Sequence, residues 1–470
     1  MQARRTAKPV SHARRIRADT GPTDRRRLAA AFLSALIPGL GQLANGRGPL
    51  ARRLLAPVLI AIGVVVIALF LSSPTRLLAS MISPSTMTAL LVVNVLVLVW
   101  RLFATLHAFF DRRYPSTTGR AGLIGLIVLV AAVSAPHALA HIYGSAARDT
   151  FSRIFETSAG RPDGSGDTAD DPSPASGQRI NILIVAIDKI PGRLATLTDT
   201  MMVVSVDPVG ETVSMLSVPR DLVNVPLGNG DEFGPKLNSL MAYADRNPRE
   251  FPNGGMRTLQ DAIGTLLEIR IDYYAQMDFI GFVKMIDAVG GVDIVVEHGF
   301  DDPTYDGYGL GQFGWKVEAG PQHFDGNNAL AYARARKAGG ESDFTRAARQ
   351  QEILVALRNK LASAGSLLFG LPDLLEAIGE YVRTDVPTGR LPELAAVSDE
   401  MGPNAIVRAV IQPPLVKSGG KNHPLGSVQI PQISEIRAMA AGLFTDPGTP
   451  PIPWPSPEPT APPPAPSGAP

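Results

Sequence analysis

The sequence predicts an α/β protein, a three-layer mixed β-sheet flanked by helices, preceded by an α-helical transmembrane region. Three observations support this prediction. Long apolar stretches lie within residues 28–143, β-rich runs alternate with helical patterns within residues 179–445, and segments rich in Gly, Ser or Pro follow each region. Strands mixed with helices favour one layered domain over separate all-α and all-β parts.

Residues 28–143 form the predicted transmembrane region. Three stretches approach the ~20 residues that a bilayer core requires. They are Leu54–Leu71, Thr88–Leu106 and Ala121–Ile142. A fourth stretch, Leu28–Leu43, is shorter and is interrupted by the run Pro38-Gly39-Leu40-Gly41, so we expect it to be re-entrant or interfacial.

Basic residues give the expected orientation. The tail of residues 1–27 is rich in Arg, and the connections that contain Arg52-Arg53 and Arg112-Arg113 are also basic. Positively charged loops remain in the cytoplasm. This predicts a multi-pass protein of the cell membrane, with residues 72–87 and everything after the third span outside the cytoplasm.

Two segments lack any pattern that could bury a core. Residues 144–178 are rich in Gly, Ser, Pro and Asp and are predicted to be a linker, and residues 446–470 are predicted to be a Pro-rich disordered tail. The chain contains no Cys, which excludes disulfides, thiolate metal sites and a Cys nucleophile. A net charge of +1 gives no reason to expect a nucleic-acid partner.

Residues 179–445 carry the mixed pattern of the predicted catalytic domain. Buried or β-rich runs predict strands, and apolar residues at helical spacing predict helices. In chain order, the strands are Ile180–Ile187, Thr200–Val206, Thr212–Val218, Tyr273–Met277 and Val292–Val296, and the helices are Leu237–Arg246, Met256–Leu267, Ile280–Val289 and Asp343–Ala362. The second and third strands flank Asp207-Pro208-Val209-Gly210 and are predicted to form a hairpin.

Two carboxylates stand at the ends of predicted strands. Asp188 ends the first buried strand, and Asp199 immediately precedes the next. Strand ends are where α/β folds place ligand-binding groups, and two carboxylates there could hold a hard cation such as Mg²⁺. The alternative is one turn residue and one capping residue.

Basic residues gather in two further places. Arg220 follows the third strand, and a guanidinium there could bind phosphate or form a surface ion pair with Asp221. Arg334 and Arg336 precede a helix that Ser342 or Asp343 could cap. On that helix, Arg346 and Gln350 are four positions apart and share a face, and Arg349, three positions after Arg346, is adjacent to that face. The cluster could bind two linked phosphates at a helix N-terminus, or it could be a solvated basic helix.

Other catalytic patterns are missing from the sequence. No G-x-S-x-G elbow, P-loop or dinucleotide fingerprint occurs. His298 and His323 show no spacing typical of a triad or a metal site and are expected to be surface or packing residues. Phe282 and Met285, on the apolar helix 279–289, could line a lipid groove or pack in the core.

With these residues in view, the chain resembles the LytR-CpsA-Psr family over about residues 181–358, with a weaker likeness through the following helices to about Phe444. The motifs that carry the resemblance are Asp188, Thr198-Asp199-Thr200-Met201-Met202-Val203, Val218-Pro219-Arg220-Asp221, Lys236-Leu237-Asn238, Ile271-Asp272-Tyr273-Tyr274, Asp287-Ala288-Val289-Gly290-Gly291-Val292-Asp293, the segment Asp325 to Arg336, and the segment Asp343 to Gln351. Two positions differ from the common family pattern: Leu197-Thr198 replaces Arg-Ser, and Lys189-Ile190-Pro191 replaces a segment with Arg.

The resemblance implies the LytR-CpsA-Psr fold with a groove for a polyprenyl tail. It implies a phosphotransferase that moves a glycopolymer of the teichoic acid, capsule or arabinogalactan type from a polyprenyl-pyrophosphate donor to peptidoglycan, releasing polyprenyl phosphate. The implied Mg²⁺ or Mn²⁺ ligands are Asp188 and Asp199. The implied pyrophosphate-binding residues are Arg220, Arg334, Arg336, Arg346 and Gln350, of which the four arginines would also be catalytic.

The general base and two rival functions remain open at this point. Asp221 and Asp343 are the nearest candidates to accept the proton of a muramic acid hydroxyl. One rival is a hydrolase that cleaves the polyprenyl pyrophosphate without attaching a polymer. The other is a non-enzymatic, wall-associated regulator that binds the lipid carrier.

Overall fold

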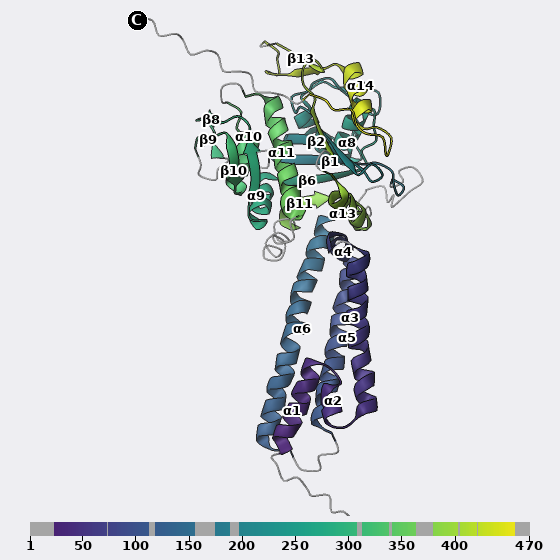
Figure 1. Cartoon of the computed structure of the whole chain (residues 1–470). Helices are drawn as coiled ribbons and strands as arrows, with labels where there is room; N and C mark the ends of the chain where they lie inside the picture. The colour runs from purple at the N-terminus through teal and green to yellow at the C-terminus, as the bar shows by residue number, and fades with distance from the viewer. Residues whose placement is uncertain are drawn as a thin grey trace, which may run out of the picture. The chain divides into compact units, whose positions relative to one another are not determined.

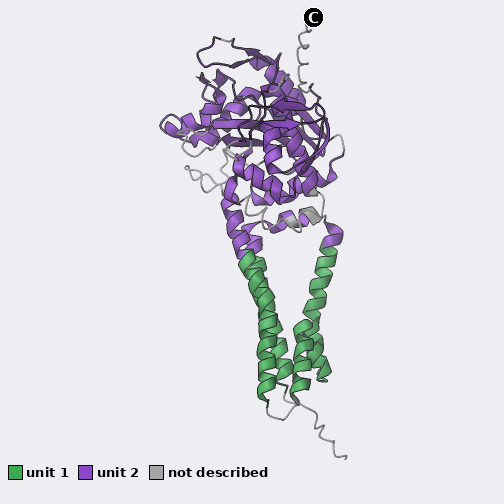
Figure 2. Cartoon of the chain, turned by 90° about the vertical axis from the view of Figure 1, so that its left-hand side faces the viewer, with its two compact units in different colours: residues 1–68, 89–144 green, residues 69–88, 145–470 purple. Residues whose placement is uncertain are grey.

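The computed structural model describes residues 23–72, 74–111, 118–155, 174–188, 197–307, 313–337, 341–362, 379–402, 405–420 and 422–455. The chain divides into two compact units, which Figure 2 colours separately. The helical unit comprises residues 1–68 and 89–144, and the sheet unit comprises residues 69–88 and 145–470.

Three long apolar helices contain the predicted membrane spans. They are α3 (Gly48–Leu71), α5 (Pro84–Phe109) and α6 (Arg120–Ile154), and each is long and apolar enough to cross a membrane. Two short helices precede them, α1 (Thr23–Leu36) and α2 (Leu40–Ala44). At 14 and 5 residues, neither reaches the ~20 residues of a span.

The turn between α1 and α2 depends on glycine. Gly39 has a φ of 107°, in the left-handed region that glycine adopts without a steric penalty. A Cβ on Gly41 would lie 1.9 Å from the carbonyl oxygen of Ala30, so only glycine permits this approach. The side chain of Gln42 then donates a hydrogen bond of 2.7 Å to the carbonyl of Ala104 in α5. The interruption seen in the sequence is therefore a helix–helix turn fixed inside the helical unit.

A six-stranded mixed sheet forms the centre of the sheet unit, in the order β11-β6-β1-β2-β3-β12 (Figure 1). Its strands are β1 (Ile180–Asp188), β2 (Leu197–Asp207), β3 (Thr212–Ser217), β6 (Tyr273–Asp278), β11 (Val382–Thr384) and β12 (Ile406–Val410). Strand β1 is parallel to β6 and antiparallel to β2, and β3 is antiparallel to β2 and parallel to β12. The predicted hairpin is confirmed as β2–β3.

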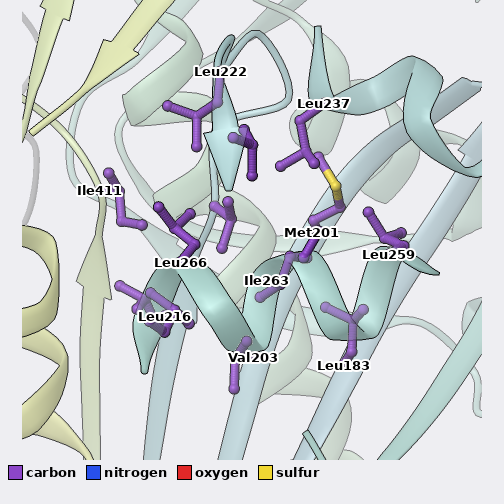
Figure 3. Packing of buried hydrophobic residues seen from close by; sticks show 14 of the residues in the cluster. Leu183, Met201, Val203, Leu216, Leu222, Leu237, Leu259, Ile263, Leu266 and Ile411 are labelled. Carbon is purple, nitrogen blue, oxygen red and sulfur yellow. The ribbon is translucent and has the colours of Figure 1, made fainter. Parts of the chain in front are cut away.

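Helices cover both faces of this sheet, which confirms the predicted three layers. One face carries α7 (Leu240–Arg246), α8 (Gly254–Leu267) and α14 (Ile433–Leu443). The other carries α9 (Phe279–Ala288), α11 (Asp343–Ala362) and α13 (Leu391–Glu400). Figure 3 shows the core of the α8 face, where the fully buried Leu183 and Met201 of the sheet pack with Leu259, Ile263 and Leu266 of the helix.

Shorter elements complete the sheet unit. They are α4 (Pro74–Met81), β4 (Val225–Pro226), β5 (Glu232–Phe233), η2 (Leu237–Ser239), β7 (Val292–Val296), β8 (Phe300–Asp302), β9 (Trp315–Val317), β10 (Gly320–Phe324), α10 (Gly326–Arg334), η4 (Thr388–Arg390), β13 (Val416–Ser418) and β14 (Gln429–Pro431). Phe300, Trp315, Phe324 and Tyr332 pack as an aromatic cluster between β8, β9, β10 and α10. This cluster fixes the end of α10, where Arg334 lies.

The structure changes two predictions. Asp199 does not precede the second strand. It lies inside β2 at a β-bulge, because Ala186 pairs with Thr200 and Ile187 pairs with Thr198. Helix α6 continues through Ile154, so residues 144–154 of the predicted linker are helical. Residues 156–173 of that linker, and residues 456–470 of the predicted tail, lie outside the described part of the chain.

Candidate active site

Four arginines from three segments line one cavity on the α11 face of the sheet. Arg220 follows β3, Arg334 ends α10, Arg336 lies two residues later, and Arg346 lies in the first turns of α11. Asp199, at the bulge of β2, lines the same cavity. The topology therefore brings together side chains that are separated by up to 147 positions in the sequence.

Close ion pairs hold three of these arginines. The Nη1 of Arg220 donates to Oδ1 of Asp199 at 2.5 Å. Oδ1 of Asp343 lies 3.1 Å from Nη2 of Arg346 and 3.4 Å from Nη1 of Arg336. The capping prediction is confirmed for Ser342, whose Oγ accepts the backbone N–H of Thr345 at 3.1 Å.

Burial makes two of the guanidinium groups suited to an anion. Arg346 is only 8% exposed, and this burial lowers its pKa to about 10. Burial would also lower the pKa of Arg220, but the carboxylates of Asp199 and Asp221 outweigh it and raise that pKa. The Nε atoms of Arg220 and Arg346 are buried and have no hydrogen-bond partner among the described residues. A buried donor without an acceptor is costly, so a bound anion would satisfy both.

The deeper wall of the cavity is apolar. Ile184, Ala186 and Met202 line it from the sheet, and further apolar side chains line it from two helices. These are Phe279, Phe282 and Met285 of α9 and Ile353, Leu354 and Leu357 of α11. The sequence left a lipid groove and core packing open for Phe282 and Met285. Both residues line the cavity and also pack in the hydrophobic cluster formed with β7, α10 and α11. This wall suits a hydrocarbon chain whose charged end lies among the arginines.

The guanidinium of Arg334 links the apolar wall to the arginines. Its Cζ lies 4.6 Å from the centre of the Phe279 ring, a cation–π contact. Nη1 of Arg334 also lies 4.0 Å from the carboxylate of Asp306. The charge is thus held at the boundary where an anionic headgroup would meet its tail.

A polar cleft adjoins the apolar cavity and shares Asp199, Arg220, Arg346 and Gln350 with it. Asp221, Asp343, Phe344 and Gln429 complete the cleft. Oδ1 of Asp221 lies 2.8 Å from the ammonium of Lys236. Burial would raise the pKa of Asp343, but Arg346, Arg220 and Arg336 outweigh it and hold that pKa below its usual value. Both candidate bases therefore lie in the same cleft.

Asp188 and Asp199 offer the hard oxygen ligands that Mg²⁺ prefers. They lie on neighbouring antiparallel strands, and Asp188 is two positions beyond Ala186, on the same face of β1. In the part of the chain that the structure describes, no three His, Cys, Asp or Glu residues are grouped so that they could hold a metal ion together. Two carboxylates fit a cation that takes its other ligands from water and from substrate phosphates, which is how Mg²⁺ usually binds.

A buried carboxylate that the sequence did not single out, Asp302, holds the arginine segment in place. Oδ2 of the buried Asp302 accepts the backbone N–H groups of Arg336 and Lys337, both at 3.0 Å. Arg349 lies on α11 but turns away from the cavity, where it pairs with Glu341 at 2.8 Å. Asp302 comes from the β8 end, 34 positions before Arg336. No local sequence pattern marks such a partner, and none marked Gln429.

The predicted residues fall into three groups. Arg220, Arg334, Arg336, Arg346, Gln350 and Asp199 line the apolar cavity, and Gln350 donates to the carbonyl of Ala333 at 3.2 Å. Asp221 and Asp343 line only the polar cleft. Asp188 lines neither, although its strand does. His323 is an exposed residue that pairs with Asp293 at 2.7 Å.

The sequence model of the LytR_cpsA_psr family matches residues 145–423. The polyisoprenyl-teichoic acid–peptidoglycan teichoic acid transferase TagU of Halalkalibacterium halodurans is 34% identical over 46% of the chain, and TagV of Bacillus subtilis is 35% identical over 40%. The cell wall biosynthesis protein LcpA of Corynebacterium glutamicum is 32% identical over 40%.

The matched regions leave part of each relative uncovered. The chain spans 63%, 45% and 37% of the lengths of TagU, TagV and LcpA, respectively. Among solved structures, the crystal structure of Bacillus subtilis TagV aligns with 57% of this chain and 98% of its own, at 27% identity and a TM-score of 0.44. TagT bound to LI-WTA aligns with 61% and 98%, at 20% identity and a TM-score of 0.45.

Proposed function

Because the chain belongs to the LytR_cpsA_psr family, we propose that it is a membrane-bound phosphotransferase that attaches a glycopolymer to peptidoglycan. Its donor would be a polyprenyl-pyrophosphate-linked glycan. The single observation that carries the proposal is the cavity itself: one apolar wall continues into a cluster of four arginines. The names of the relatives, two of them teichoic acid transferases, support the same class of reaction.

In the proposed reaction, the prenyl tail lies against the apolar wall and the pyrophosphate lies among the arginines. A hydroxyl oxygen of peptidoglycan attacks the phosphorus that carries the sugar. A new O–P bond forms as the bond to the bridging oxygen breaks, and polyprenyl phosphate leaves with that electron pair. The hydroxyl proton passes to a carboxylate of the polar cleft, for which Asp221 and Asp343 are the candidates. The glycan is then joined to the wall by a phosphodiester.

The arginines would contribute mainly electrostatic stabilisation. Phosphoryl transfer needs positioning and neutralisation of charge on the phosphoryl oxygens more than covalent chemistry. The buried guanidinium groups of Arg220 and Arg346 suit this role, since both line the cavity and the Nε atom of each forms no hydrogen bond within the described residues. Asp188 and Asp199 would hold Mg²⁺ or Mn²⁺, which when bound supplies further charge neutralisation.

The membrane placement is part of the proposal. We expect α3, α5 and α6 to span the membrane, because each is long and apolar enough. The basic connections near Arg52-Arg53 and Arg112-Arg113 would then be cytoplasmic. This would place the sheet unit on the outer side, where peptidoglycan and the lipid-linked donor meet.

The decisive experiment is transfer by the purified full-length protein in detergent. The protein is incubated with a short glycan-pyrophosphate-polyprenol, a peptidoglycan oligomer and Mg²⁺, and the oligomer is examined by mass spectrometry. We expect covalently attached glycan, and Arg346→Ala should reduce its formation about 10²–10³-fold, as when one donor of an oxyanion site is removed. Arg358→Ala is the matched control, because Arg358 lies on the same helix and contacts Ser398 instead of the cavity.

Each rival function has a distinct outcome in this assay. Release of free glycan phosphate without attachment would identify a hydrolase. Tight binding of the donor without turnover would favour the regulator. If Arg346→Ala and Arg358→Ala transferred glycan equally well, the assignment of the site would be wrong.

Metal dependence tests the proposed role of Asp188 and Asp199. Chelation should abolish transfer, and added Mg²⁺ or Mn²⁺ should restore it. Asp199→Asn should raise the metal concentration needed for half-maximal Mn²⁺ binding, measured by electron paramagnetic resonance without any donor. Unchanged Mn²⁺ binding in both Asp188→Asn and Asp199→Asn would refute this role.

A further inference from the structure

A second cavity lies along helix α8, with a volume of about 570 Å³. The turn between β4 and β5 forms one rim at Leu227 and Gly228, and Phe251 lies on the segment before the helix. Gln260 lines it from α8 and Ile271 from the segment after the helix. The volume is within the range of about 300–1,000 Å³ that is typical of small-molecule sites. We call this cavity the α8 groove.

The α8 groove is separate from the proposed active site. Helix α8 directs Leu259, Ile263 and Leu266 into the core against one face of the sheet. The arginine cavity is lined by Ile184 and Met202, which belong to the opposite face. The two sites share no lining residue, so the α8 groove is not part of the proposed transfer site.

The charges of the groove do not suit a phosphate. Its two arginines already have carboxylate partners, Arg257 with Asp261 at 3.1 Å and Arg270 with Asp272 at 2.9 Å. Two more carboxylates of the lining, Glu250 and Glu268, form no ion pair in the described part of the chain. Hydrogen-bond acceptors are thus in excess, so a ligand that donates hydrogen bonds is favoured over an anion.

One buried amide lacks a partner at the same place. Gln260 is 3% exposed, and its Nε2 has no hydrogen-bond acceptor among the described residues. Leaving such a buried donor without an acceptor destabilises the protein, because the amide has lost its hydrogen bonds to water. Beside it, the half-buried ring of Phe251 and the buried Ile271 give the groove an apolar floor. A hydroxyl group can both accept from the amide and donate to a carboxylate.

We propose that the α8 groove binds a neutral, hydroxyl-rich glycan chain. Sugar hydroxyls match the excess of carboxylates and the single amide donor, and the C–H face of a sugar ring matches the apolar floor. This function goes beyond the proposed transferase activity, because the groove would hold a glycan beside the enzyme without reacting with it. Such binding would retain the protein at a polysaccharide while the other face of the sheet carries out transfer.

The test introduces a large side chain at the rim of the groove. A Cβ on Gly228 would lie 3.8 Å from Oγ1 of Thr265 and 4.0 Å from Cβ of Asp261, and the φ of Gly228 is outside the left-handed region. The backbone there accepts a side chain, and Gly228→Phe would place a ring at the rim. Gly389→Phe is the matched control: a Cβ there meets nothing within 4 Å, and Gly389 does not line the groove. Thermal unfolding of both variants checks that they fold.

Binding is measured by titration calorimetry with the full-length protein and neutral tetrasaccharides of N-acetylglucosamine, galactose and arabinose. We expect at least one tetrasaccharide to bind the parent protein. Its affinity should be about tenfold or more lower for Gly228→Phe and should be unchanged for Gly389→Phe and Arg346→Ala. The proposal would be overturned if none of the three tetrasaccharides bound the parent protein. It would also be overturned if Gly228→Phe bound them with the same affinity as the parent protein. Loss of binding in Arg346→Ala alone would locate the sugar in the arginine cavity instead. Transfer activity is not needed for this readout, so the two proposals can fail independently.

Discussion

The two faces of the central sheet carry similar apolar side chains and use them differently. Along β1, Leu183 and Val185 point to the α8 face and are fully buried. Ile184 and Ala186 alternate with them, point to the α11 face and are half-buried, because they line the cavity. Successive side chains of a strand alternate between faces, so one strand supplies both a sealed core and a binding wall.

This contrast separates stability from ligand binding along a single strand. On the α8 face, packing is complete and each removed methyl group leaves a void. On the α11 face, the strand already borders a cavity, so truncation enlarges a space that exists. Truncation at neighbouring positions of β1 should therefore destabilise the protein by different amounts, more on the α8 face than on the α11 face.

The largest expected effect is on stability, at Leu183. Leu183→Ala should lower the free energy of unfolding by ~2–5 kcal/mol, the usual cost of a cavity in a packed core. Ile184→Ala, its neighbour, should cost about 1 kcal/mol, because its side chain already faces open space. Denaturant unfolding of the sheet unit, followed by tryptophan fluorescence in the full-length protein, measures both.

Equal losses of stability in Leu183→Ala and Ile184→Ala would contradict this view of the two faces. The Arg358→Ala variant gives the baseline for a substitution on the outer part of α11.

The sequence predicts β1 well but not this asymmetry. The run Ile180–Ile187 is apolar except for Asn181, which is typical of a strand buried on both faces. Leu183 and Ile184 are equivalent in that pattern, and the difference between them arises from the helices that cover each face. Those helices, α8 and α11, are 89 positions apart at their first residues, so no local pattern records which one leaves a cavity.

The second effect concerns the donor lipid, through Ala186. Ala186→Phe would place a ring in the apolar cavity, where it would exclude part of the prenyl tail. Excluding one large apolar group of the tail from the cavity should weaken donor binding by ~1.5–3 kcal/mol. The KM for the long-chain donor should therefore rise about tenfold or more. A donor with a very short prenyl chain should show little change, and it serves as the control.

A uniform change in KM for short and long donors would indicate that the prenyl tail does not lie against Ala186. If kcat fell while KM stayed unchanged for both donors, the new ring would instead have displaced Asp188, two positions further along β1.

The arginine site shows the same limit of sequence reasoning at single-residue scale. Helical spacing correctly put Arg346 and Gln350 on one face, and both line the cavity. The same spacing also brought Arg349 close to that face, yet Glu341 and the rings of Phe300 and Tyr332 hold it on the other side. Its partners come from other elements, so spacing within the helix could not exclude it from the site.

The position of Asp199 depended on pairing rather than composition. The strand was expected to begin after this residue, but the bulge lets β2 start at Leu197 and still directs Asp199 toward Arg220. A bulge inserts one extra residue and re-aims a side chain. Such a register change depends on the partner strand and leaves no mark in the residue pattern of β2 alone.

The smallest expected effect is the pH dependence contributed by Asp343. Its pKa is lowered in the folded protein, because the charges of Arg346, Arg220 and Arg336 outweigh its burial. A carboxylate with a lowered pKa stabilises the fold fully above its ordinary value of 3.8, and that stabilisation is lost as the pH falls through the lowered folded value. Asp343→Asn should therefore be less stable than the parent protein at pH 6, and the two should converge as the pH falls below 3.8.

The difference should be modest, because the side chain of Asp343 is 38% exposed and solvent screens its ion pairs. Melting temperatures of both proteins from pH 3 to pH 7 measure it. A difference that stays constant across this range would show that the arginines do not stabilise the carboxylate. The lowered pKa of Asp343 also affects its suitability as a base, because a carboxylate that arginines hold ionised accepts a proton weakly. If Asp343→Asn transferred glycan at more than about a tenth of the parental rate, Asp221 would be left as the base.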